Sequence, residues 1–247
     1  MRRVETIMGM PVSIDLPDGN SDRIFSTVFN FLRSVDRQFS MYKRSSELRK
    51  YRTGEIGENE TTSLFREIRA LCEMYSKQTN GYFSAYYCGP YDPTGLVKGW
   101  AIQRAATLLK AEGMSTYMIN IAGDICVSSS TDKVWTIGIQ NPTSNQELID
   151  VISLQNGGVA TSGTYERGNH IFNPHTRLRT DELVSATVYG SDIMTADVFA
   201  TACLAMESEQ AVDFIEKQNG YEAFLVTSTN KKRSTSRFAS KMQNAQQ

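Results

Sequence analysis

Residues 150–162, with the sequence DVISLQNGGVATS, carry the pattern that most constrains the fold of this chain. Asn156-Gly157 is a dipeptide typical of a two-residue β-hairpin turn, and strand-like apolar residues lie on both sides of it. We therefore expect strands at 150–155 and 158–162, joined as a hairpin.

Strand patterns continue outward from this stretch in both directions. Upstream, residues 4–16 alternate loosely and end at a turn-forming cluster, and residues 117–121 form a strand pattern that closes on Ala122-Gly123-Asp124. We expect further strands at 134–140 and 184–189, and a closing hairpin from 222–228 and 233–239.

Helical patterns interrupt these strands without a regular alternation. In residues 22–39 the apolar side chains recur at steps of three and four, and Ser21 is a suitable N-cap. Further helices are expected at 62–77, 97–111, 195–206 and 209–218. Because helices and strands do not alternate, we expect an α+β fold with mostly antiparallel sheets packed with helices, not a doubly wound parallel sheet.

Composition limits the classes of protein that the chain can belong to. It has 247 residues, a net charge of −1, 40% hydrophobic and 21% charged residues, which is typical of a globular protein with a packed core. The balanced charge gives no basic field for nucleic acid. We expect one domain over 1–240, a frayed tail over 241–247, no membrane insertion and a cytoplasmic location, since no signal peptide or lipobox pattern occurs. The oligomeric state is left open.

The four cysteines show no metal-binding or redox spacing. Cys72, Cys88, Cys126 and Cys203 are scattered, without a Cys-x-x-Cys pair. We interpret them as small buried hydrophobic residues.

The strongest candidate for chemistry is Asp197 with Thr201, in the segment TADVFAT at 195–201. On a helix, residues four apart lie on the same face, so a carboxylate and a hydroxyl would project together. Hard oxygen ligands of this kind suit Mg²⁺. The alternative is that Asp197 favours the positive start of its helix and that Thr201 only packs.

Three further features are candidates with structural alternatives. His170 can act as an acid, a base or a transient nucleophile, or have no role. The segment DPTGLVKGW at 92–100 has glycines that allow close approach of a ligand, a following helix start that attracts phosphate, and Lys98; the alternative is a plain turn before a helix. Tyr42, Tyr82 and Phe83 can stack on a flat ring or belong to the core.

Taken together, these segments resemble the FAD:protein FMN transferases, also called the ApbE family, over nearly the whole chain. The motifs follow the family's order. They are Met8-Gly9, Ser40-Met41-Tyr42-Lys43, Ser46-Glu47-Leu48, Gly81-Tyr82-Phe83, Val97-Lys98-Gly99-Trp100-Ala101, Asn120-Ile121-Ala122-Gly123-Asp124-Ile125, Ala160-Thr161-Ser162-Gly163, His170-Ile171-Phe172-Asn173-Pro174-His175-Thr176 and Ala196-Asp197-Val198-Phe199-Ala200-Thr201.

The resemblance implies an ApbE-like, T-fold-related architecture and a specific activity. Members of the family bind FAD and Mg²⁺, attach FMN to a Thr or Ser hydroxyl of an acceptor protein, and release AMP. His170 and Asp197 would be catalytic. The metal would be held by Asp197, Thr201 and the backbone at Val97 and Ala200. The FAD site would comprise Met8, Tyr42, Tyr82, Phe83, Ser84, Thr94, Lys98, Trp100 and Ile171.

Three departures from the family pattern leave other activities open. Ala122 stands where the family has glycine, Asn173 and Arg177 replace an aspartate and a glycine, and Ser84 replaces an aspartate. One alternative is Mg²⁺-dependent hydrolysis of FAD to FMN and AMP. Another is a protein that binds FAD without turnover.

Overall fold

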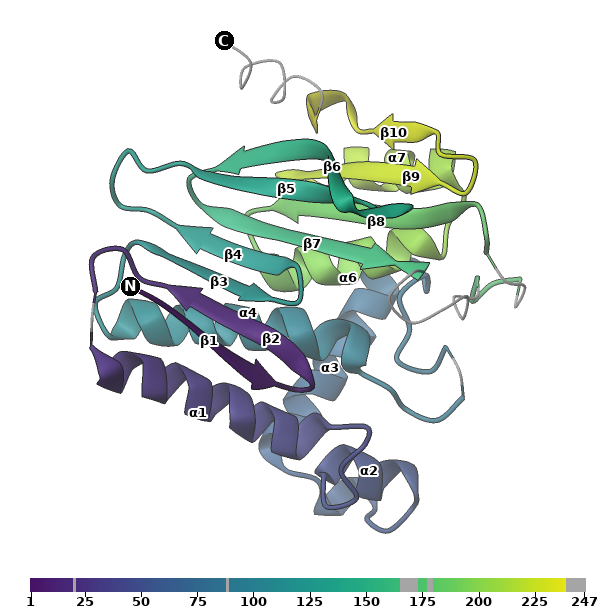
Figure 1. Ribbon diagram of the computed structural model, residues 1–247. Coiled ribbons are helices and arrows are strands. Elements are labelled where there is room, and N and C mark those ends of the chain that lie inside the picture. Colours follow the sequence, from purple (N-terminus) through teal and green to yellow (C-terminus); the bar gives the residue numbers. More distant parts are fainter. Residues whose placement is uncertain (20, 88, 165–172, 177–179, 239–247) are drawn as a thin grey trace.

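The computed structural model describes residues 1–19, 21–87, 89–164, 173–176 and 180–238, and its centre is an eight-stranded sheet (Figure 1). The strand order is β1-β2-β3-β4-β7-β8-β9-β10, and every pairing in it is antiparallel. The strands are β1 (Arg2–Ile7), β2 (Met10–Asp15), β3 (Tyr117–Ile121), β4 (Asp124–Ser128), β7 (Gly157–Gly163), β8 (Leu183–Gly190), β9 (Tyr221–Thr227) and β10 (Lys232–Ser234).

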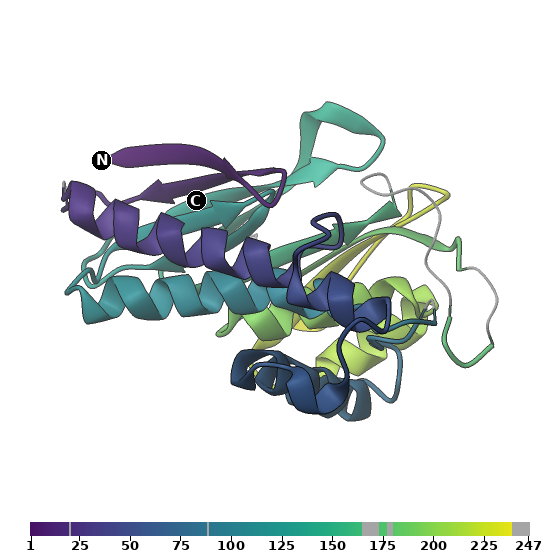
Figure 2. The ribbon, with the colours of Figure 1, turned by 90° about the horizontal axis from the view of Figure 1, so that it is seen from below.

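Helices cover one face of this sheet, and a separate two-stranded sheet covers part of the other (Figures 1 and 2). The helices are α1 (Asp22–Phe39), α2 (Glu47–Arg52), α3 (Ser63–Gln78), α4 (Thr94–Ala111), α6 (Ile193–Leu204) and α7 (Ser208–Glu216), with a 3₁₀ turn at Glu58–Glu60. The small sheet consists of β5 (Trp135–Asn141) and β6 (Ser144–Leu154). The expected α+β class with antiparallel sheets is confirmed.

The two faces of the large sheet belong to two hydrophobic cores. Side chains alternate along a strand, so neighbours in sequence enter different cores. In β4, Cys126 packs in the helix-side core, whereas Ile125 and Val127 pack in the core beneath β5 and β6. Strand β9 divides in the same way, with Leu225 on the helix side and Phe224 on the other. The larger core therefore holds the helices on the sheet.

The predicted hairpin around Asn156-Gly157 is wrong, although the strands on each side exist. Strand β6 pairs with β5, whereas β7 pairs with β4 and β8. The Asn156 side chain accepts hydrogen bonds from the Ser128 hydroxyl (3.1 Å) and the Ser129 N–H (3.0 Å), which ties this dipeptide to the end of β4. A tight turn of the right composition here links two sheets, because tertiary contacts decide which strands pair.

Other sequence predictions were incomplete rather than misplaced. Residues 4–16 form two strands, because Met8 and Gly9 both have positive φ (57° and 73°) and make a tight hairpin turn between β1 and β2. Strand β4 and helix α2 were not predicted. Helix α4 begins at Thr94, three residues before the expected start, so Gly95, which was expected to precede the helix, lies inside it.

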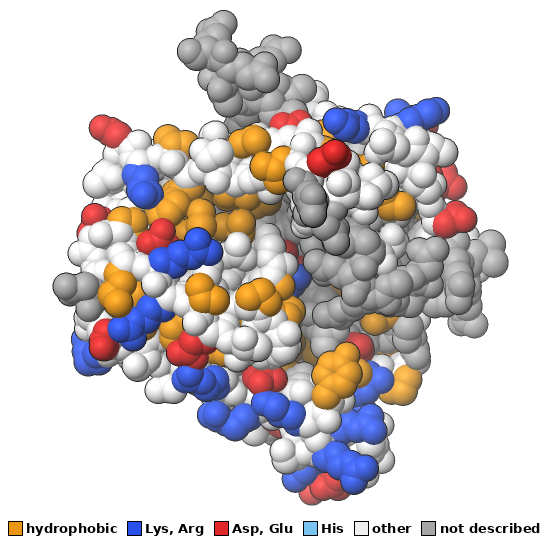
Figure 3. All heavy atoms as spheres, in the orientation of Figure 1, with side chains coloured by type: hydrophobic (Ala, Val, Ile, Leu, Met, Phe, Trp, Pro, Cys, Tyr) orange, Lys and Arg blue, Asp and Glu red, His pale blue; other side chains and the backbone are white. Residues whose placement is uncertain are grey.

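The surface carries an uneven distribution of charge despite the net charge of −1. In Figure 3, Lys and Arg side chains gather over the lower part of the view, where Figure 1 places α1 and α2. Within the described part of the chain, no helix combines the length and apolar character needed to cross a bilayer.

Candidate functional site

Helices α4 and α6 lie in close contact at two glycines, and this contact positions the predicted metal-binding residues. A Cβ atom added at Gly99 would lie 2.8 Å from the Asp197 Cβ and 2.9 Å from the Met194 Cα. One turn earlier on α4, a Cβ added at Gly95 would lie 3.7 Å from the Thr201 hydroxyl. Residues four apart on α4 thus face residues four apart on α6, so Asp197 and Thr201 project from one face, as expected.

Asp197 is a buried carboxylate in an environment that disfavours its charge. Its side chain is 3% exposed, and one oxygen accepts the Gly99 N–H at 2.8 Å. Burial, followed by the neighbouring Asp124 carboxylate, raises the pKa of Asp197 to about 8, although the Lys98 ammonium and the Gly99 N–H oppose the rise. A buried acid with a raised pKa beside a second acid is typical of a functional site.

Asp124 and Lys98 complete this charged cluster. Asp124 is fully buried, its Oδ2 lies 2.8 Å from the Lys98 Nζ, and its Oδ1 accepts the Thr161 N–H at 3.2 Å. Two acids and one ammonium therefore meet where β4, α4 and α6 come together. The cluster has an excess of negative charge when both acids are ionised, which favours an added cation.

Thr201 lies beside a second hydroxyl at the same contact between elements. The hydroxyl oxygen of Thr201 on α6 lies 3.3 Å from the hydroxyl oxygen of Ser162 on β7, so two neutral oxygens are neighbours here. Ala200 is fully buried in α6 and Val97 is 5% exposed in α4. The structure brings the four residues predicted to hold a metal onto these two adjoining helices.

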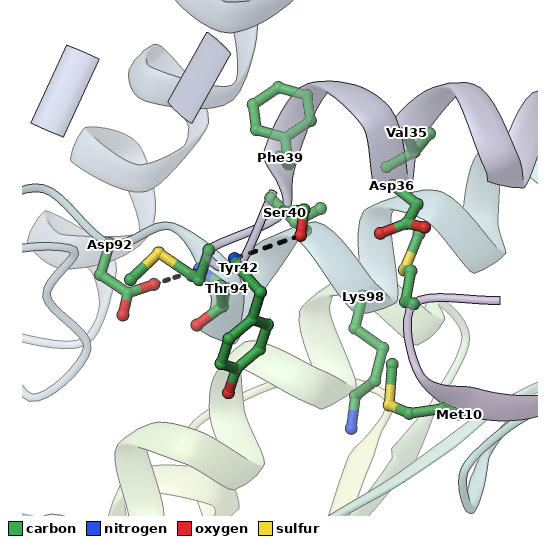
Figure 4. Close-up of a pocket in the computed structure, with 12 residues that line it drawn as sticks. Met10, Val35, Asp36, Phe39, Ser40, Tyr42, Asp92, Thr94 and Lys98 are labelled. Carbon is green, nitrogen blue, oxygen red and sulfur yellow. Dashed lines mark hydrogen bonds between the residues drawn. The ribbon is translucent and has the colours of Figure 1, made fainter. Parts of the chain in front are cut away.

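A cavity of about 290 Å³ opens beside this cluster, near the lower end of the size range of small-molecule sites (Figure 4). Five residues predicted from sequence line it: Met8, Tyr42, Thr94, Val97 and Lys98. Lys98 belongs to both the cavity wall and the charged cluster. A molecule in this cavity would therefore have the Lys98 side chain against it.

The cavity wall also combines thioether and aromatic surface. Met8 and Met10 come from the β1–β2 hairpin, and Met41 and Tyr42 follow α1. The Tyr42 side chain is 95% exposed, and Figure 4 shows it among the lining residues with Thr94 and Lys98. Flat, polarisable surface of this kind suits an aromatic ring system.

Four of the residues predicted to bind a cofactor lie outside the lining of this cavity. Phe83 is 2% exposed and packs against Gly95. Trp100 is 4% exposed and lies next to the ring of Phe31, with a centroid separation of 6.0 Å. Both have clear packing contacts, and their contact with a ligand stays a prediction.

Tyr82 and Ser84 have local partners within the described chain. The Tyr82 hydroxyl is hydrogen-bonded to the Gln210 side chain, and its ring lies 4.6 Å from the His175 ring. The Ser84 hydroxyl accepts the Tyr86 N–H at 3.1 Å. The predicted His170 and Ile171 lie outside the described residues.

Sequence reasoning did not assign a role to several residues that the structure places here. Asp36, Ser40 and Asp92 line the cavity, and Asp124 joins the charged cluster. Three of them, Asp124, Ser40 and Asp92, stand in motifs quoted from the sequence, and this was the signal that could have drawn attention to them. Asp36 has no such signal, because only the packing of α1 beside α4 places it at the cavity.

The family model and the curated relatives that match this chain point to the same family. The model of the family described as "ApbE family" matches residues 91–225, which is more than half of the chain. The FAD:protein FMN transferase of Vibrio cholerae serotype O1 is 32% identical over 137 residues, covering 51% of this chain and 41% of that protein. The chain thus spans about two-fifths of the length of the curated relatives that it matches.

Solved structures agree over almost the whole chain. The flavinyl transferase ApbE of Pseudomonas stutzeri in its apo form has a TM-score of 0.83 at 20% identity, with 98% of this chain and 96% of that chain covered. The flavin transferase ApbE of Vibrio cholerae has a TM-score of 0.79 at 20% identity, with 97% and 98% covered. At this level of identity the likeness establishes the fold.

Proposed function

The chain belongs to the ApbE family, and from that premise we propose that it transfers the FMN part of FAD to a Ser or Thr hydroxyl of an acceptor protein, with Mg²⁺ as its metal. One observation carries the proposal. The cavity of about 290 Å³ has Val97 and Lys98 of α4 in its wall, and α4 is the helix that packs on Asp197 and Thr201. A ring-binding surface and a cation-binding cluster thus adjoin along one helix.

The residues present fit a magnesium ion. Asp197 offers a buried carboxylate, and Thr201 offers a hydroxyl from the same helix face. Mg²⁺ favours a few hard protein oxygens together with phosphate oxygens and water. Asp197 and Thr201, with the backbone carbonyls of Val97 and Ala200, are the residues that would hold it. Bound there, the ion would neutralise charge on a diphosphate and orient it.

The surroundings of the cavity fit the two chemically different parts of FAD. Met8, Met10 and Tyr42 supply thioether and aromatic surface for a flat ring. Lys98 supplies a positive charge for the diphosphate, and it can do so while its ammonium stays paired with Asp124. A dinucleotide in this cavity would then lie against α4, with its diphosphate toward α6.

The chain's own residues must place the acceptor hydroxyl in line with the phosphorus on the flavin side of FAD. The hydroxyl oxygen forms the new P–O bond, the bond to the bridging oxygen breaks, and that oxygen leaves with AMP. The hydroxyl proton must pass to a base, and His170 is the expected one. Positioning and charge neutralisation supply most of the rate enhancement in reactions of this type.

Mass spectrometry tests the proposal directly. The protein is incubated with FAD, MgCl₂ and an acceptor domain that carries a flavinylation Thr, and the acceptor is then examined for a covalent FMN group. We expect the FMN adduct together with an equal amount of AMP. The same acceptor with that Thr changed to Ala should stay unmodified. Release of free FMN and AMP without an adduct would identify hydrolysis instead, and intact FAD would identify binding alone.

Removal of the metal-binding carboxylate tests the residue assignment. Asp197→Ala should abolish transfer, because the cation loses its charged ligand. Asp213→Ala on α7 is a matched control, since Asp213 is an exposed acid on a neighbouring helix. Transfer by the Asp197 variant at the rate of the control would contradict the role given to this residue.

A further inference from the structure

Two buried carboxylates, Asp124 and Asp197, lie near the ammonium group of Lys98. The Lys98 Nζ is paired with Asp124 at 2.8 Å, whereas Asp197 accepts the Gly99 N–H. We propose that Asp124 is a positioning residue that holds the Lys98 ammonium away from Asp197, so that Asp197 stays available to a divalent cation. This inference rests on the proposed function, because it concerns the same metal site.

Asp124 is held rigidly enough to fix the position of its partner. It is the first residue of β4 and directly follows the tight turn at Ala122-Gly123, where the Asn120 side chain accepts the Gly123 N–H at 2.9 Å. Its Oδ1 accepts the Thr161 N–H of β7. The turn thus fixes the backbone of Asp124, the Thr161 N–H holds its carboxylate, and its Oδ2 faces Lys98.

Lys98, in contrast, reaches the cluster on a long side chain that can turn toward either acid. Its side chain is 17% exposed and comes from α4, one residue before the glycine that contacts Asp197. Both Lys98 and Asp124 act electrostatically on Asp197, so the three groups are close neighbours. A largely buried ammonium needs a counter-charge, and a lysine side chain adjusts readily to find one.

The position of the ammonium therefore decides which carboxylate can bind a cation. While Lys98 pairs with Asp124, the Asp197 carboxylate next to Thr201 lacks a full counter-charge. If Asp124 lost its charge, Asp197 would become the ion-pair partner of Lys98. The ammonium and a metal ion would then compete for the same carboxylate.

Manganese binding to the flavin-free protein tests this inference, with Mn²⁺ as a spectroscopic probe for Mg²⁺. The loss of the electron paramagnetic resonance signal of free Mn²⁺ measures the dissociation constant, and the titration is repeated with FAD present. Asp124→Asn keeps the shape and the acceptor for Thr161. We expect it to weaken Mn²⁺ binding by about tenfold or more, because Lys98 moves to Asp197.

The double variant Asp124→Asn with Lys98→Met separates positioning from a direct contact. It removes the competing ammonium, so Mn²⁺ affinity should return to within about threefold of the unsubstituted protein. If the double variant binds as weakly as Asp124→Asn alone, Asp124 acts as a direct ligand of the ion, and the inference is overturned. Unchanged affinity in Asp124→Asn overturns it as well.

Two controls keep this failure distinct from a failure of the proposed metal site. Asp197→Asn should abolish Mn²⁺ binding; if it has no effect, or if the unsubstituted protein does not bind Mn²⁺ in either titration, both proposals fall. If Asp124→Asn does not fold, the single variant Lys98→Met tests the inference. Mn²⁺ binding by this variant at least as tight as that of the unsubstituted protein supports the inference, and loss of Mn²⁺ binding refutes it.

Discussion

At the scale of single residues, Asp197 shows how a site is built at the expense of stability. The folded chain buries this acid beside Asp124, and its pKa rises to about 8 for that reason. An unfolded chain releases the same proton near pH 4. Folded protein therefore holds a proton that the unfolded chain has lost, and the stability of the metal-free protein falls as pH rises from about 4 to about 8.

Replacement of Asp197 by Asn should remove this part of the pH dependence. The amide can accept the Gly99 N–H and donate to Asp124, so we expect the metal-free variant to be more stable by about 1–3 kcal/mol at pH 8 and by less at pH 5. Urea unfolding in EDTA at several pH values measures the difference. Asp213→Asn on the exposed side of α7 should not alter the profile. A difference from the unsubstituted protein that does not grow with pH would refute this account.

Ala122 carries a conformational cost at the turn that leads into Asp124. Its φ is 49°, in the left-handed region that L-residues with a Cβ avoid by roughly 1–2 kcal/mol. Glycine has no such cost, and its greater freedom in the unfolded chain offsets about 0.5–1 kcal/mol of the gain. Ala122→Gly should thus stabilise the protein by up to about 1 kcal/mol.

Thermal unfolding measures the effect of Ala122→Gly, and Ala111→Gly is the matched control. Ala111 is an exposed residue at the end of α4, so glycine there should destabilise by about 0.5–1 kcal/mol. Opposite signs for the two substitutions are the expected result. If both substitutions destabilise the protein, the positive φ of Ala122 is not a source of lost stability.

At the scale of elements, the contact between α4 and α6 depends on the absence of a side chain at Gly99. A Cβ there would lie 2.9 Å from the Met194 Cα, which is backbone and cannot rotate away. Alanine would gain about 1 kcal/mol of helix propensity, but separation of two packed helices costs more. The contact between α4 and α6 therefore decides whether alanine at position 99 stabilises or destabilises the protein.

We expect Gly99→Ala to destabilise the protein by about 1–3 kcal/mol and to weaken Mn²⁺ binding, because α6 must move with Asp197 on it. Gly57→Ala serves as the control, since the nearest atom to its added Cβ is a Glu60 carboxylate oxygen at 3.5 Å and its φ is −90°. Chemical denaturation and Mn²⁺ titration measure both effects. A Gly99 variant as stable as the Gly57 variant would mean that the helices can separate freely.

At the scale of the whole molecule, the sheet separates the site from a second core. The cluster around Asp197 belongs to the helix side, whereas Phe238, at 1% exposure, packs on the opposite face with Tyr189 and Phe224. Stability lost on that face should leave the proposed metal site intact. The two properties can therefore be changed independently.

Phe238→Ala should lower the free energy of unfolding by about 3 kcal/mol, as expected for a fully buried aromatic ring. The increase in melting temperature on addition of Mn²⁺ should be the same as in the unsubstituted protein. Val134→Ala, at a side chain that is 55% exposed, should change neither quantity. Loss of the Mn²⁺ response in the Phe238 variant would show that the two faces are coupled.

The sequence by itself determined many of the helices and strands and the composition of part of the candidate site. Helix α1 and strand β3 could be predicted because apolar spacing along a continuous segment is a local property. The pairing of Asp197 with Thr201 was accessible for the same reason, since residues four apart on one helix share a face. Sequence motifs carried the family, and with it the expected FAD and metal.

Only the tertiary structure decided which segments meet. The Asn156-Gly157 turn joins different sheets, and Gly95 and Gly99, which were expected to allow close approach of a ligand, lie against α6. Asp124 became part of the site only when β4, α4 and α6 packed together. These outcomes depend on contacts between residues far apart in the chain, and those contacts follow from packing and buried charge, which no local spacing of residues encodes.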